Sequence, residues 1–182
     1  MNKELLGKLV NRASEMALAN KWGEKSLKIN TMILQMDSTN AAACTRLAKY
    51  FKLQDNLLEA KKMYSKALEI NPNNLGARNN FDEIVKYQDE KEFVDKLTTG
   101  RDANDTARTL AQKGKYELSI KCFLKAYSIE PLLKYAVSLA KIYNKVGKYD
   151  EVKNLYKQLL GANQSLKDID AVNSEFTILL QR

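Results

Sequence analysis

The sequence predicts an all-α protein built as an α-solenoid, which is a stack of antiparallel helix pairs. The main observation is a pattern that occurs twice: residues 57–72 and 116–131 place a leucine or tyrosine, a small residue, an aromatic residue, alanine and proline at the same offsets. Helical periodicity also runs along nearly the whole chain. Helix breakers are scarce, with seven glycines and two prolines. A repeat of this length indicates stacked units rather than one globular core.

Helical periodicity gives the elements in order, and short breaks separate them. Pro72 and Pro131 each follow a helix, because the residue before proline avoids the α conformation. Gly114 and Gly147 fit the short turns between paired helices, where a left-handed residue ends the first helix. The expected helices are 3–19, 22–36, 40–53, 56–69, 74–87, 90–98, 101–113, 116–129, 132–146, 149–160 and 165–180.

The segment 74–98 departs from the regular pattern. Projected as one helix, the apolar residues of its two halves point to nearly opposite sides. They are Phe81, Ile84 and Val85 in the first half and Phe93, Val94 and Leu97 in the second. Either the helix breaks near residues 87–89, or one long helix packs on both faces. We predict a break, followed by a shortened second helix.

Composition argues against an enzyme. Histidine, the commonest general base and transition-metal ligand, is absent. Cys44 and Cys122 lie at apolar helix positions, so we interpret them as buried free thiols of a reducing compartment. A glycine-rich phosphate loop, a nucleophile elbow and a metal-ligand cluster are missing from the sequence. We therefore expect no catalytic residues, no metal and no cofactor.

The organisation of the chain indicates one soluble, cytoplasmic domain without membrane contact. No segment approaches the roughly 20 apolar residues that span a bilayer, and the start lacks an apolar signal region. No linker rich in Gly, Pro or Ser divides residues 1–182. The expected parts are five units and a capping helix, at 3–38, 40–73, 74–99 (irregular), 101–133, 134–163 and 165–180.

The second and fourth units resemble tetratricopeptide repeats. The residues that match the family's pattern are Cys44, Leu47, Ala48, Phe51, Leu57, Ala60, Tyr64, Ala67 and Pro72 in one, and Ala103, Ala107, Leu110, Gly114, Tyr116, Ser119, Phe123, Ala126 and Pro131 in the other. The resemblance implies a right-handed superhelix whose first helix in each pair lines a concave groove. It also implies another protein or a peptide as partner. The family's clamp for C-terminal carboxylates is not supported, since Glu15 occupies one of its places.

The groove-facing stripe that the resemblance implies is strongly basic. Thirty such positions hold eleven Lys or Arg and three Asp or Glu, which equals the formal charge of +8 for the whole chain. Asparagine amides on the stripe can both donate to and accept from a peptide backbone. We therefore predict an interaction module that binds an acidic or extended peptide segment. The predicted contacts are Asn11, Arg12, Arg46, Lys49, Lys52, Asn80, Lys86, Asn104, Arg108, Lys141, Asn144 and Lys145.

Two alternatives remain open. A basic groove also attracts the phosphates of a nucleic acid, although Tyr87 is the stripe's only aromatic residue for base stacking. A self-associating adaptor or scaffold is the other alternative, because the last helix carries an apolar stripe. That helix either caps the fifth unit, which we favour, or forms a homodimer interface. Its stripe comprises Leu166, Ile169, Val172, Phe176, Leu179 and Leu180.

Overall fold

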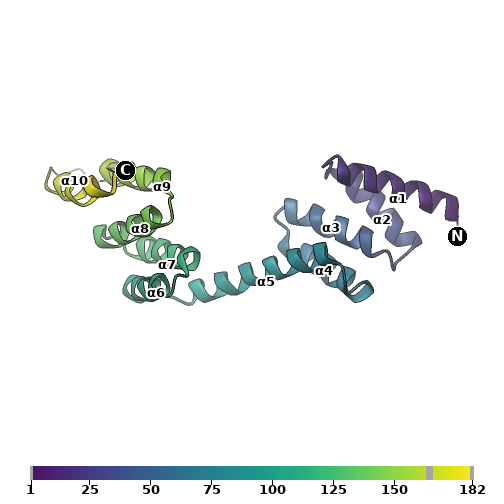
Figure 1. Cartoon of the computed structure of the whole chain (residues 1–182), viewed down its shortest axis with the longest axis horizontal. Helices are drawn as coiled ribbons and strands as arrows, with labels where there is room; N and C mark the ends of the chain where they lie inside the picture. Colours follow the sequence, from purple (N-terminus) through teal and green to yellow (C-terminus); the bar gives the residue numbers. More distant parts are fainter. Residues whose placement is uncertain (1, 163–165, 181–182) are drawn as a thin grey trace. The chain divides into compact units, whose positions relative to one another are not determined.

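The computed structural model describes residues 2–162 and 166–180, and the side chains of 166–169 lie outside the description. All secondary structure in these residues is helical, which confirms the predicted all-α fold of paired helices (Figure 1). The elements are α1 (Lys3–Leu18), α2 (Glu24–Met36), α3 (Ala41–Leu53), α4 (Leu57–Ile70), α5 (Leu75–Asp95), α6 (Gly100–Gln112), α7 (Tyr116–Ile129), α8 (Leu133–Lys145), α9 (Tyr149–Ala162) and α10 (Leu166–Leu180).

Asparagine side chains set the start of several helices. The side chains of Asn2, Asn40, Asn56 and Asn74 each accept a hydrogen bond from the backbone N–H three residues later, and Thr99 does the same at α6. Such N-caps satisfy a backbone donor that the first turn leaves without a partner. These caps therefore stabilise the first turns of α1, α3, α4, α5 and α6.

Left-handed residues close the turns within the helix pairs. Gly114 and Gly147 have φ values of 75° and 78°, as the sequence predicts. Asn20 and Asp55 take the same conformation in the first two pairs, with φ values of 54° and 57°. Because Asn and Asp tolerate this conformation better than most residues, these turns form without glycine.

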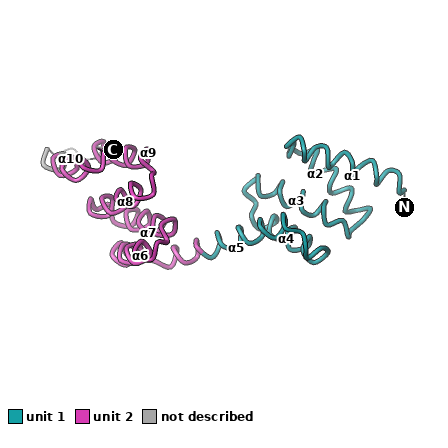
Figure 2. The backbone as a smooth tube through the Cα atoms, viewed as in Figure 1, with its two compact units in different colours: residues 1–89 teal, residues 90–182 magenta. Residues whose placement is uncertain are grey.

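The described chain forms two compact units, residues 1–89 and residues 90–182, shown in separate colours in Figure 2. Each unit has its own buried core. Alanines that are fully buried, such as Ala48 and Ala60 in unit 1 and Ala107 and Ala126 in unit 2, allow neighbouring helices to approach closely. That residues 1–182 make a single domain stays a prediction.

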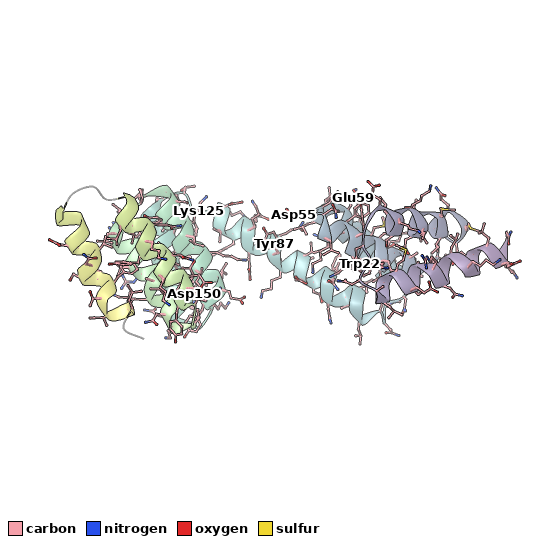
Figure 3. All side chains as sticks on the ribbon, turned by 90° about the horizontal axis from the view of Figure 1, so that it is seen from above. Trp22, Asp55, Glu59, Tyr87, Lys125 and Asp150 are labelled. Carbon is pink, nitrogen blue, oxygen red and sulfur yellow. The ribbon has the colours of Figure 1, made fainter. Side chains whose placement is uncertain are left out.

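The predicted break near residues 87–89 is wrong. Helix α5 runs without interruption from Leu75 to Asp95, so the rejected alternative of one long helix is the observed one. Tyr87, at the expected break, projects from the continuous helix and is exposed (Figure 3). Ile84 lies in the core of unit 1, while Val94 packs against the core of unit 2. The apolar side therefore changes along the helix because its two halves pack in different cores.

Helix α10 packs onto the end of unit 2. Val172 and Phe176 are fully buried, and Leu179 and Leu180 pack against the same core. The ring of Phe176 lies 5.6 Å from that of Tyr156, whose hydroxyl donates to Asn173 Oδ1 at 2.7 Å. The described members of the apolar stripe are thus used for capping. Leu166 and Ile169 belong to the side chains outside the description, as do residues 163–165 of the predicted last unit and helix.

Candidate functional site

A groove with a volume of about 640 Å³ lies on unit 2. Helices α6, α8 and α10 form its walls. The first two each begin a helix pair, and α10 caps the unit. Figure 1 shows these helices as successive layers of the unit, with α8 between the other two. The residues that line the groove are Arg108, Ala111, Gln112, Phe123, Leu133, Lys134, Val137, Ser138, Lys141, Ile142 and Glu175.

Helical spacing places one row of α8 on the groove. Lys134, Val137, Ser138 and Lys141 are separated by helical steps that keep them on one face. Arg108, Ala111 and Gln112 form the equivalent row on α6. These seven residues belong to the thirty positions that the resemblance places on the groove-facing stripe, and two of them, Arg108 and Lys141, are among the predicted contacts. The structure therefore brings these rows of α6 and α8 together on one groove of unit 2.

The groove combines an apolar floor with a charged rim. Phe123 of α7 and Val137 are buried, and they close the floor. Arg108, Lys134 and Lys141 are exposed at the rim. Among the described residues, none of these three cations forms an ion pair within 4.0 Å; the ammonium of Lys134 lies 5.1 Å from the ring centroid of Tyr135. Their charges are thus available to an anionic ligand.

Sequence reasoning missed four of the residues that line the groove: Phe123, Leu133, Ile142 and Glu175. The first three are apolar; Phe123 was matched to the repeat pattern, whereas Leu133 and Ile142 were assigned no role. Glu175 comes from α10, which was predicted to cap the stack and not to contribute to the groove. Its position between Val172 and Phe176, on the exposed side of an apolar helix, is the only signal in the sequence that could have indicated it.

In unit 1, several predicted contacts are already engaged with neighbouring side chains. Lys52 of α3 donates to Asn80 Oδ1 at 3.0 Å and pairs with Glu83 at 2.5 Å, both on α5. Arg12 pairs with Glu15 one turn away at 3.0 Å. These pairs neutralise part of the charge that the stripe was expected to present. Asn11 and Lys86 are exposed, and Lys49 is half-buried.

Arg46 belongs to a buried polar network that joins α1, α2 and α3. Its guanidinium donates to Ser14 Oγ at 2.9 Å and to Asn30 Oδ1 at 3.3 Å. Asn30 is fully buried, and its amide nitrogen donates to the carbonyl of Ser26 at 2.8 Å. Burial lowers the pKa of the Arg46 guanidinium below its ordinary value. The contacts of Arg46 therefore hold helices together.

The remaining predicted contacts of unit 2 lie beside the groove. The Asn104 side chain is buried and donates to Asp105 Oδ1 at 3.1 Å. The ammonium of Lys145 lies 5.1 Å from the ring centroid of Tyr116. The Oδ1 atom of Asn144 is buried and accepts no hydrogen bond within the described part of the chain. Of the predicted residues in this unit, only Arg108 and Lys141 line the groove itself.

Both cysteines are buried free thiols, as predicted. Burial raises the pKa of Cys122 to about 11 and also raises that of Cys44. Neither thiol lines the groove. Within the described residues, no group of three or more acidic or cysteine side chains could hold a metal ion. Helices long and apolar enough to cross a membrane are also absent from that part of the chain.

Two segments, residues 41–74 and 107–131, match the family described as tetratricopeptide repeat. The first contains α3 and α4, and the second contains the last part of α6 and all of α7. These two segments are therefore tetratricopeptide repeats, as the resemblance indicated for the second and fourth units. Proteins of this fold generally serve as non-catalytic scaffolds for protein–protein interaction.

Solved structures also share partial similarity with the chain. MamA residues 41 to the end, from Desulfovibrio magneticus RS-1, is 13% identical with a TM-score of 0.43, covering 97% of this chain and 93% of that chain. TTC0263 from Thermus thermophilus is 13% identical with a TM-score of 0.43, covering 94% and 99%. YrrB, described as a TPR protein with an unusual peptide-binding site, is 17% identical with a TM-score of 0.41, covering 94% and 88%. No curated protein sequence matches the chain.

Proposed function

We propose that this protein is a non-enzymatic adaptor whose unit 2 binds an acidic, extended peptide segment in the groove between α6, α8 and α10. The observation that carries the proposal is the arrangement of Arg108, Lys134 and Lys141 around an apolar floor, without acidic partners within 4.0 Å in the described chain. A cation that makes no internal ion pair can attract and orient an anionic ligand, because no ion pair within the protein has to break first.

The groove also offers groups suited to a peptide backbone. Gln112 and Ser138 lie beside the cations, and both side chains can donate and accept hydrogen bonds. Leu133 and Ile142, which are half-buried, supply apolar surface for one ligand side chain. An extended segment with acidic residues and an aliphatic residue would use all three kinds of contact.

The cations of unit 1 support this function less directly. Arg12, Arg46 and Lys52 are held by contacts within the unit, so a ligand would have to replace those contacts. A cytoplasmic location likewise stays a prediction from the sequence. Seven other predicted contacts do not line the groove of unit 2, and their role in binding stays a prediction. They are Asn11, Lys49, Asn80, Lys86, Asn104, Asn144 and Lys145.

A charge-reversal experiment tests the proposal. A fluorescent peptide of Asp, Glu and Leu is titrated with the full chain, and binding is followed by anisotropy at low and at near-physiological ionic strength. We expect saturable binding that weakens with salt. Arg108→Glu with Lys141→Glu should weaken it at least about tenfold, because two attractive contacts become repulsive.

The matched control reverses two exposed lysines outside the groove, Lys148→Glu and Lys157→Glu, for the same change in net charge. Equal weakening by both double variants would show only a general charge effect and would overturn the groove proposal, as would no binding at all. Tighter binding of a single-stranded RNA of the same charge would indicate a nucleic-acid site instead. The groove does not favour that outcome, since the aromatic residue of its described lining, Phe123, is buried and not available for stacking.

A further inference from the structure

The groove carries one acidic side chain among its described lining residues, Glu175 of α10. Glu175 is exposed, and in the described chain no ion pair within 4.0 Å joins it to Arg108, Lys134 or Lys141. A carboxylate that only balanced the groove's charge would be expected to pair with one of these cations. Glu175 and the three cations thus line the same groove without forming an ion pair with one another in the described chain.

The position of Glu175 is fixed by the packing of its neighbours. Val172 and Phe176, three residues before it and one residue after it, are 1% and 0% exposed. The hydrogen bond from Tyr156 to Asn173 anchors the same turn to α9 at 2.7 Å. Because α10 cannot rotate without exposing these groups, the carboxylate stays on the wall of the groove.

The charges of the groove are therefore ordered along the stack. The cations belong to α6 and α8, apolar side chains of α8 lie at the floor, and the carboxylate belongs to α10. A ligand that crosses from α6 to α10 meets the positive charge of α6 and α8, together with the apolar surface of α8, and then the negative charge of α10. A uniformly acidic segment would be repelled at the α10 end.

We propose that Glu175 makes the groove selective for a bipolar peptide segment, with an acidic residue at one end, an apolar residue in the middle and a lysine or arginine at the other end. This proposal rests on the peptide-binding function proposed above. The acidic residue meets Arg108 and Lys141, and the basic residue pairs with Glu175. The apolar residue lies against the half-buried Leu133 and Ile142. Glu175 is then the specificity-determining residue of the site.

Geometry sets the length of the segment. Neighbouring packed helices are about 8–10 Å apart, so two such steps from α6 to α10 span roughly 18 Å. An extended peptide rises about 3.3 Å per residue. The acidic and basic residues of the ligand should therefore lie roughly five or six positions apart.

The experiment compares two labelled peptides of equal length with the full chain. Both carry Asp and Glu at one end and leucine in the middle; the bipolar peptide carries two lysines at the other end, and the acidic peptide carries two glutamates there. We expect the wild-type protein to bind the bipolar peptide about fivefold more tightly or better. Glu175→Lys should reverse this preference, and Glu175→Gln should remove most of it.

Glu151→Lys is the matched control, since it reverses an exposed carboxylate of unit 2 that does not line the groove. It should leave the ratio of the two affinities unchanged. If neither peptide binds the wild-type protein, the peptide-binding function itself fails. If both bind and Glu175→Lys leaves their ratio unchanged, or if the wild-type protein prefers the acidic peptide, the selectivity of Glu175 fails while the function stands.

Discussion

At the scale of single residues, Arg46 shows how a charged residue on the expected stripe can serve packing. The sequence placed it among the predicted contacts, whereas its guanidinium bonds to Ser14 and Asn30 on two other helices. Asn30 is buried, so its carbonyl oxygen depends on this donor. The network therefore predicts a cost in stability when Arg46 is removed.

Arg46→Ala should lower the free energy of unfolding by about 1–3 kcal/mol, because Asn30 loses a donor that water cannot easily replace. Urea unfolding followed by circular dichroism measures this change. Lys49→Ala is the control: Lys49 is a neighbouring predicted contact with no ion pair within 4.0 Å in the described residues, and its loss should change stability by no more than about 0.5 kcal/mol. Equal stability of the two variants would show that the network contributes nothing.

The sequence could indicate Arg108 and Lys141 as residues of the groove in unit 2, but not which of the predicted contacts are engaged with neighbouring side chains. Helical spacing put Arg108, Lys141 and Arg46 on equivalent faces, because spacing depends only on local geometry. The partners of Arg46 come from positions 16 and 32 residues away in the sequence, and Glu175 reaches the groove from a different helix. Such contacts depend on how the helices pack, for which no local pattern exists.

At the scale of elements, the repeated caps and turns were predictable and the long helix was not. Pro72, Pro131, Gly114 and Gly147 act locally, and each ends or follows a helix as expected. The residues of α5 offered a local reason for a break, since their apolar side changes midway. The helix continues because Ile84 and Val94 each pack against a core in their own half, although Phe93 in the second half is exposed.

The continuity of α5 can be tested at Asp89, an exposed residue in the middle of the predicted break. Asp89→Pro should cost about 3 kcal/mol, because proline removes a backbone hydrogen bond and its ring clashes with the preceding turn. Thermal unfolding followed by far-UV circular dichroism gives the loss. Asp89→Ala should be neutral or slightly stabilising. A proline variant as stable as the alanine variant would mean that the chain breaks there in solution, as the sequence first indicated.

At the scale of the whole molecule, the two strongest repeats place equivalent buried aromatic residues in the cores of different units. Tyr64 and Phe123 occupy the same position of the two strongest repeats, eight residues before Pro72 and Pro131. Both are buried, but Tyr64 lies in a core of unit 1 and Phe123 in the core of unit 2. Burial also raises the pKa of Tyr64 to about 12, in keeping with an apolar site.

Because the buried cores of the two units have no residue in common, damage to one core should mainly affect its own unit. Tyr64→Ala should destabilise by about 3 kcal/mol or more and speed amide exchange chiefly in unit 1, including the first half of α5. Phe123→Ala should do the same in unit 2, including α10. Hydrogen exchange followed by mass spectrometry compares the two variants segment by segment, and each serves as the control for the other. Uniform acceleration along the chain in both variants would instead show that the units unfold as one cooperative structure, despite their separate cores.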